Sequence, residues 1–161
     1  MMLSDIRDYI ASLNLANTVY MGKLDAKEEK SIGVYHSKRS KEYRTAIGGP
    51  ELESYGVKYI TLLVHWNKSL RDTERAATSL FKKIQQEREA AVNGEKIKFF
   101  QPLYEIQDVG TDDAGIYEMV IEAAVVFGKK RSEQEYEIRN GPSKVCGKDG
   151  SVPVLRKPVP D

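Results

Sequence analysis

The sequence predicts an α+β fold, a mainly antiparallel sheet with two helices packed on it. Several short segments among the 161 residues are rich in Val, Ile, Tyr and Phe, as strands are. Two other segments carry apolar residues at helical spacing. The predicted order is helix, strand, strand, long loop, strand, helix, strand, strand, followed by an extended C-terminal arm. In such an order neighbouring strands run antiparallel and the helices cover one side.

The first helix is expected over residues 4–14, where Ser4 can cap its N-terminus. Its apolar stripe, which we expect to pack on the sheet, consists of Leu3, Ile6, Tyr9, Ile10 and Leu13. Segments 18–24 and 31–37 then follow as two short strands. The charged sequence "DAKEEK" separates them, and we expect an antiparallel pair joined by a turn.

The segment 57–67, "VKYITLLVHWN", is apolar on both faces of a strand, which predicts a central strand covered on both sides, at least in an assembly. Ser69 and Asp72 form a start signal for the second helix. We expect this helix to end at Asn93-Gly94. Its apolar stripe is predicted to be Leu70, Thr73, Ala77, Leu80, Phe81, Ile84 and Arg88.

Two strands complete the predicted sheet. Residues 96–106 contain Pro102, which cannot donate a ladder hydrogen bond, so this strand is expected at an edge or with a bulge. Residues 107–115 are expected to be a turn. Residues 116–128 alternate strictly, and Tyr117, Met119, Ile121, Ala123, Val125 and Phe127 are expected to face the core. A shift of one residue would turn Glu118 and Glu122 inward, which fixes the register.

The composition changes after residue 128. Residues 129–161 contain four of the six prolines and few large apolar groups, so alone they cannot offset their ordering entropy. We therefore expect a domain over residues 1–128 and an arm over residues 129–161. The arm is expected to bind the domain's own sheet edge or a neighbouring chain. Its predicted apolar anchors are Tyr136, Ile138, Val154 and Leu155.

Residues 36–56 are a long polar stretch between two predicted strands, and loops of this length are functional or disordered. Mixed charges suit a protein partner better than a uniform phosphate backbone, because opposite charges fix register. A DNA contact and a merely solvated loop are the other two interpretations. The predicted contact residues of this loop are Lys38, Arg39, Glu42, Tyr43, Arg44, Glu51 and Glu53.

The sequence does not predict catalysis, a cofactor or a metal site. Gly48-Gly49-Pro50 lacks the lysine and the following helix of a phosphate-binding loop. The two histidines, His36 and His65, and the single Cys146 show no ligand spacing or nucleophile signature. We interpret His65 as a hydrogen-bonded sheet histidine. Asp108, Asp112 and Asp113 are interpreted as residues of a solvated turn rather than a cation site.

Composition argues against some further classes of protein. Twenty-five basic and twenty-four acidic residues nearly cancel, whereas a dedicated nucleic-acid-binding protein carries a basic excess. The N-terminal sequence does not match a signal peptide, and no apolar run approaches the roughly 20 residues of a membrane span. The lone cysteine fits synthesis in a reducing cytoplasm. We therefore expect neither a membrane partner nor a small-molecule ligand.

Residues 3–128 resemble the tail terminator proteins of long-tailed phages, a family also labelled minor capsid proteins. The resemblance rests on the order of the predicted elements and on "VYMGKLDAKEEKSIGVYHS", "GGPELESYG", "VKYITLLVHWN", "KSLRDTERAATSLFKKIQ" and "EMVIEAAVVFGK". It implies a non-enzymatic subunit of a hexameric ring in the virion, assembled in the host cytoplasm. The ring would cap the tail tube, end its polymerisation, meet the head-completion or stopper protein, and let DNA pass through its lumen.

Three alternatives remain open at this stage. The first is another head–tail connector component, such as a head-completion protein. The second is a nucleic-acid-binding module that uses an exposed sheet face. The third is a small enzyme, which would need a pocket with converging titratable groups.

Overall fold

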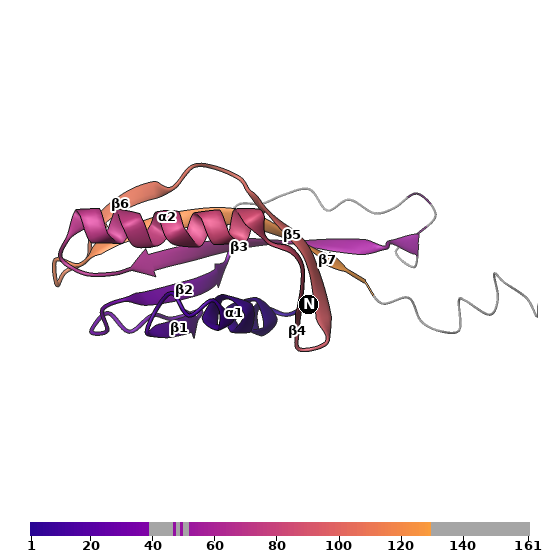
Figure 1. Cartoon of the computed structure of the whole chain (residues 1–161), viewed down its shortest axis with the longest axis horizontal. Helices are drawn as coiled ribbons and strands as arrows, with labels where there is room; N and C mark the ends of the chain where they lie inside the picture. Colours follow the sequence, from indigo (N-terminus) through magenta and orange to yellow (C-terminus); the bar gives the residue numbers. More distant parts are fainter. Residues whose placement is uncertain (39–46, 48, 50–51, 130–161) are drawn as a thin grey trace, which may run out of the picture. The chain divides into compact units, whose positions relative to one another are not determined.

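The computed structural model describes residues 1–38, 47, 49 and 52–129, and Figure 1 shows their arrangement. These residues confirm the α+β class, with two helices and one mostly antiparallel, curled sheet. The helices are α1 (Leu3–Ser12) and α2 (Leu70–Gln86), and the strands are β1 (Thr18–Met21), β2 (Ser31–His36), β3 (Tyr55–His65), β4 (Arg88–Val92), β5 (Glu95–Pro102), β6 (Gln107–Thr111) and β7 (Tyr117–Gly128). The strand order is β1-β2-β3-β7-β5-β4, and β6 also pairs with β7. The division into a domain and an arm stays a prediction, because residues 130–161 lie outside the described part.

Helix α1 packs on the sheet through the predicted stripe, but its cap differs from the prediction. The buried residues are Leu3, Ile6, Tyr9 and Ile10. The helix begins at Leu3, so Ser4 lies inside the first turn rather than at the cap. Asp5 takes over the capping role, because its carboxylate accepts a hydrogen bond of 2.6 Å from the backbone N–H of Met2.

Strands β1 and β2 are neighbours but run parallel, so the predicted antiparallel hairpin is wrong. The register pairs Thr18 with Ser31 and Met21 with Val34. The chain must reverse direction twice between parallel neighbours, and residues with positive φ stand at both ends of the connection, Gly22 (79°) and Lys30 (56°). The charged segment is long enough for two reversals, whereas a hairpin needs only one.

Strand β3 is central, antiparallel to β2 on one side and to β7 on the other. On one face Ile60, Leu62 and Val64 are completely buried. On the other face the residues before His65 are half-buried, and Val57 is 42% exposed. The prediction of a strand covered on both faces therefore holds for one face of the single chain.

Helix α2 begins as predicted and ends earlier than predicted. The hydroxyl of Ser69 accepts a hydrogen bond of 3.4 Å from the backbone N–H of Asp72. The helix ends at Gln86, and the chain then forms the hairpin of β4 and β5 around Asn93-Gly94. Both turn residues have positive φ (50° and 75°), as a type I′ hairpin turn requires. The Asn-Gly pair thus marks a hairpin, and Arg88 belongs to a strand rather than to the apolar stripe of the helix.

The remaining strands contain one element that was not predicted. On strand β7, Met119, Ile121, Ala123 and Val125 face the core as predicted, whereas Tyr117 and Phe127 are half-buried and Glu122 on the other face is also buried. Strand β5 ends at Pro102 after a bulge between Ile97 and Phe99. Residues 107–111, expected as part of a turn, form β6 and pair with β7. Asp and Gly in this segment favour turns, but pairing with the long strand β7 outweighs that preference.

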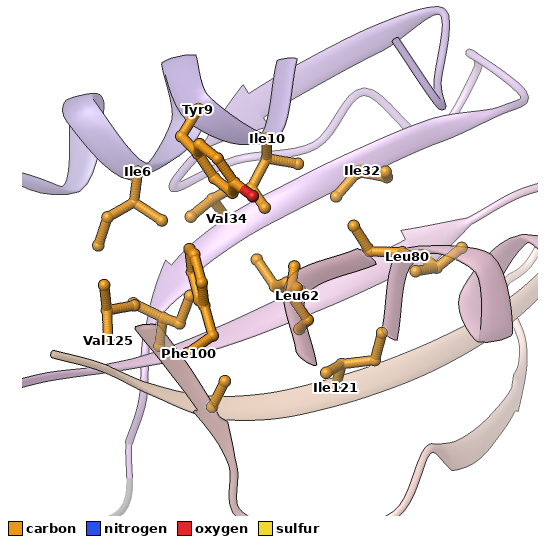
Figure 2. Packing of buried hydrophobic residues seen from close by; sticks show 14 of the residues in the cluster. Ile6, Tyr9, Ile10, Ile32, Val34, Leu62, Leu80, Phe100, Ile121 and Val125 are labelled. Atoms are coloured by element: carbon orange, nitrogen blue, oxygen red, sulfur yellow. The ribbon is translucent and has the colours of Figure 1, made fainter. Parts of the chain in front are cut away.

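Both helices pack on the same face of the sheet, and Figure 2 shows side chains of α1, α2 and four strands meeting there. The rings of Tyr9 and Phe100 stack with their centroids 5.2 Å apart. The hydroxyl of Tyr9 donates a hydrogen bond of 2.7 Å to Glu87. Each fully buried large side chain stabilises the fold by roughly 1.5–3 kcal/mol. Neither of the described helices lies on the opposite face, which leaves that face and the ends of the sheet available for contacts.

Candidate assembly surfaces

The two polar segments predicted to make contacts adjoin the described domain at the same end of the sheet. Residues 39–51 begin after β2 and lead into β3, and residues 130–161 follow β7. The backbone N–H of Lys129 donates a hydrogen bond of 3.1 Å to the carbonyl of Ser54. The ammonium group of Lys129 also forms an ion pair with the carboxylate of Glu53. We call this region, formed by Lys38, residues 52–57 and Lys129, the exit end. Figure 1 shows the strands β3 and β7 that lead to it.

Two of the predicted contact residues lie in the described part of the chain, at the exit end. Lys38 is exposed, whereas the Glu53 side chain is only 10% exposed and is paired within its own subunit. Glu53 therefore helps to hold the start of β3 beside the end of β7 in its own subunit. The contact roles stay predictions, and the following residues lie outside the described part: Arg39, Glu42, Tyr43, Arg44, Glu51, Tyr136, Ile138, Val154 and Leu155.

Exposed apolar side chains surround the exit end, and the sequence analysis did not single them out. Val57 pairs with Val126, and Val126 pairs with Phe99, so the three residues form a row across three strands on the face without helices. Val57 and Phe99 are 42% and 37% exposed. The sequence signal for them is the second apolar face of β3, which predicted a strand covered on both sides, at least in an assembly. Apolar groups gathered beside polar segments are typical of a protein interface.

The opposite end of the β3–β7 pair is closed by a buried histidine. His65 is completely buried, and its Nε2 lies 3.0 Å from Oδ2 of Asp112. Its Nδ1 lies 3.1 Å from the carbonyl oxygen of Glu28. Both partners only accept, so each contact is a hydrogen bond when the facing ring nitrogen carries the hydrogen. We call this region, formed by Ser31, His65, Asp112 and Glu118, the histidine end.

Two carboxyl groups at the histidine end have shifted pKa values of opposite sign. The hydrogen bond from His65 lowers the pKa of Asp112 below its ordinary 3.8, and the backbone N–H of Ile116 acts in the same direction. Burial raises the pKa of Glu118 above its ordinary 4.5, and the charge of Asp112 adds to this, while His65 opposes it. The interpretation of residues 107–115 as a solvated turn is therefore wrong for Asp112, which is a partner of His65. Asp108 and Asp113 are exposed, as expected.

The contacts of Ser31, His65 and Asp112 invite comparison with a hydrolase triad, but the geometry does not support that activity. Ser31 and His65 are both completely buried, so no substrate reaches them. The hydroxyl of Ser31 donates a hydrogen bond of 3.1 Å to the carbonyl of Glu28, and it lies 3.5 Å from the ring of His65. A nucleophile needs access to its substrate and a close hydrogen bond to its base. The interpretation of His65 as a structural sheet histidine fits this geometry.

A shallow hollow of about 330 Å³ lies between the first half of α2 and the adjoining ends of β2 and β3. Its apolar lining comes from Leu15, Ile32, Trp66 and Ala76. The polar residues around it are Lys30, Asn67, Asp72, Arg75 and Ser79. Among the described residues, no group of three or more His, Cys, Asp and Glu side chains is placed to hold a metal ion. No helix in the described part of the chain is long and apolar enough to cross a membrane.

Comparison with known proteins identifies the family. No curated protein matches this chain. A family model described as bacteriophage tail terminator protein matches residues 7–127, well over half of the chain. This is a family of structural proteins of the phage tail, not a family of enzymes, and the match confirms the resemblance seen in the sequence. The chain belongs to the bacteriophage tail terminator family.

Proposed function

We propose that six copies of this protein form a ring that caps the phage tail tube, ends its polymerisation and presents a surface to the head-completion or stopper protein. The family match over residues 7–127 carries this proposal. The subunit acts in the tail and neck region of the virion after assembly in the host cytoplasm. DNA passes through the lumen of the ring, and the subunit needs no cofactor.

The exit end supports this proposal because two polar segments of the sequence adjoin the same end of a long strand pair. Strands β3 and β7 form this pair, and the polar residues 39–51 and the arm that follows Lys129 adjoin it at one place. Segments without a core of their own gain binding energy when they order on a partner. The exposed row of Val57 and Phe99 offers apolar area beside them. In a ring each contact occurs six times, so individually weak contacts add up.

The charge balance is consistent with a closed ring. The formal net charge of the chain is +1 at pH 7. Strongly charged subunits repel one another in a compact assembly. Local pairs of opposite charge can then set the orientation of neighbours without a large overall repulsion.

The proposal is tested by replacing residues 39–51 with a Gly/Ser sequence of equal length, which keeps the reach of the segment and removes its side chains. The expected result is a folded subunit that no longer forms rings on purified tail tubes. Particle mass with and without tubes measures ring formation, and tube length in electron micrographs measures capping. A matched control neutralises exposed charges on α2, Glu74→Gln and Lys82→Gln, and should assemble normally.

Two results would contradict the proposal in different ways. Normal rings and normal capping by the Gly/Ser variant would show that residues 39–51 make no essential contact. Failure of the unaltered protein to bind tubes, together with binding to the head connector, would instead assign it to the head-completion proteins. Truncation after Lys129 tests the arm by the same measurements, and loss of assembly is again expected.

A further inference from the structure

The hollow beside Trp66 is preformed by hydrogen bonds of the subunit itself. The backbone N–H of Lys30 donates a hydrogen bond of 2.7 Å to the carbonyl of Trp66, which ties the β1–β2 connection to the end of β3. The side chain of Asn67 accepts a hydrogen bond of 2.9 Å from the backbone of Ser69 at the start of α2. A site that is already ordered costs little conformational entropy when a partner binds.

The hollow combines an apolar floor with exposed positive charge at its rim. Ile32 is buried, and Trp66 and Ala76 are half-buried. Lys30 is exposed, and the side chain of Arg75 is 74% exposed and only loosely paired with Asp72, at 4.0 Å. Two cations and one carboxylate leave the rim positive. The matching ligand is an aliphatic side chain accompanied by negative charge.

A segment with that chemistry lies on strand β6 of the same protein. Val109 occupies the bulge of β6 and is 53% exposed. Asp108 precedes it and is exposed, with Oδ1 accepting a hydrogen bond of 2.9 Å from the backbone N–H of Gly110. The exposed Asp113 follows in the next turn. The bulge thus presents an aliphatic side chain next to carboxylates.

The hollow and the bulge lie on opposite flanks of the sheet at the same level. The strand register places Ser31, His65, Glu118 and Gly110 in one row across β2, β3, β7 and β6. Lys30 adjoins one end of this row, and Val109 adjoins the other. Figure 1 shows β2 and β6 on opposite sides of the β3–β7 pair. One subunit therefore cannot bring its own bulge to its own hollow.

We propose that the β6 bulge of one copy, Asp108 and Val109, docks into the hollow of the next copy, between Lys30, Trp66 and Arg75. Val109 would contact the apolar floor, and Asp108 would meet the two cations. Such a contact is head-to-tail, because two different surfaces meet. Since both surfaces lie at the same level of the sheet, each copy can follow the last by a rotation with little shift along the strands, as a closed ring requires. The inference deepens the proposed function, since it identifies a lateral contact of the ring.

The test is cysteine cross-linking in a chain whose single Cys146 is replaced by Ser. The variant carries both Val109→Cys and Ala76→Cys, so that neighbouring copies can form a disulfide at each contact. Under mild oxidation of protein assembled on tail tubes, we expect a ladder of covalent oligomers that ends at the number of subunits in the ring. The controls are each cysteine alone, and Val109→Cys combined with a cysteine at the exposed Ala11. None of the controls should give a ladder.

The outcomes separate this inference from the proposed function. Rings of normal mass without a ladder would overturn the docking of β6 and leave the ring itself intact. Covalent dimers from Val109→Cys alone would mean that two bulges face each other, which also overturns it. If no ring forms on tubes and no ladder appears, both ideas fail. A charge reversal adds a second measurement: Lys30→Glu should weaken ring formation by at least tenfold in subunit concentration, and adding Asp108→Lys should restore part of it.

Discussion

At the histidine end, a buried side chain holds three segments of the chain together, whereas at the exit end two polar segments adjoin the sheet beside exposed apolar groups. The same two strands, β3 and β7, connect both ends. At the histidine end, His65 has contacts with Glu28 and Asp112. At the exit end, Val57 on the same strand is 42% exposed. The subunit thus keeps its internal order at one end and leaves surface available for partners at the other.

This difference separates two ways of making contacts. The hollow and the β6 bulge lie beside the histidine end, so their binding to each other needs little further ordering of the chain. At the exit end, the described surface available to a partner is the exposed row of Val57 and Phe99. The family associates with components of the phage tail, and the proposed ring adds contacts between copies of the subunit. We expect the rigid contact to be the one between identical subunits.

The largest effect on stability is expected for Leu62→Ala, with Val57→Ala on the same strand as the comparison. Leu62→Ala should lower the free energy of unfolding by about 2–5 kcal/mol, because Leu62 is completely buried and its loss leaves a cavity. Val57→Ala should change it by no more than about 0.5 kcal/mol, because Val57 belongs to the exposed surface. Urea unfolding of the isolated subunit measures both. Equal losses would show that the exit end is as tightly packed as the core.

The two histidines of the chain provide the second test. His65→Leu should lower the free energy of unfolding by about 1–3 kcal/mol, because the contacts of the ring nitrogens with the carbonyl of Glu28 and the carboxylate of Asp112 are lost. His36→Leu is the matched control, since His36 is exposed at the other end of β2, and it should have almost no effect. If His65→Leu left the free energy of unfolding unchanged, water would replace the histidine at no cost in stability.

Much of this architecture could be predicted from the sequence because it depends on local patterns. The stripe of α1, the cap of α2 and the alternation of β7 were readable, since each reflects burial of one face or one capping hydrogen bond. The strands β4 and β6 were not predicted. Glu and Ala in β4 favour helix, and Asp and Gly in β6 favour turns. Both strands exist because they pair with a neighbour, which a local pattern does not record.

The candidate surfaces were less accessible to sequence reasoning than the fold. The polar character of residues 36–56 and 129–161 was evident from the sequence. That residues 53–54 and Lys129 lie together depends on the pairing of β3 with β7, the hydrogen bond from Lys129 to Ser54 and the ion pair of Lys129 with Glu53. The partnership of His65 and Asp112 joins residues far apart in the sequence through the folding of β6 and β7. The hollow likewise needs Lys30, Trp66 and Arg75, which come from three separate segments of the chain. Contacts between distant segments depend on topology, which single-residue patterns do not contain.

The third test uses the pH dependence of stability at the histidine end. The pKa of Asp112 is lowered in the folded state, so its contribution is present above pH 3.8 and is lost as the pH falls below that value. The pKa of Glu118 is raised, so its ionised form costs stability once the pH rises past 4.5. We expect Asp112→Asn to lower the urea midpoint at neutral pH, and Glu118→Gln to raise it there.

The differences in urea midpoint between the two variants and the unaltered protein should shrink in acid, because the carboxyl groups that remain are then neutral. The urea midpoint recorded from neutral pH to below pH 3.8 provides the measurement. Asn at position 112 can still accept the turn hydrogen bonds from Ala114 and Ile116, so the change acts mainly on the contact with His65. If both variants shifted the urea midpoint in the same direction at neutral pH, the opposite effects assigned to ionised Asp112 and ionised Glu118 would be wrong.

The smallest effect on stability is expected for the ion pair between Glu53 and Lys129 at the exit end. The Lys129 side chain is 34% exposed, and a partly exposed pair contributes about 0–1 kcal/mol. A double-mutant cycle with Glu53→Gln and Lys129→Gln isolates this coupling, because other contacts of either residue cancel between the arms of the cycle. The coupling should weaken as salt is added. A coupling above about 2 kcal/mol that persists in salt would show a rigid exit end in the free subunit, and the contrast with the histidine end would disappear.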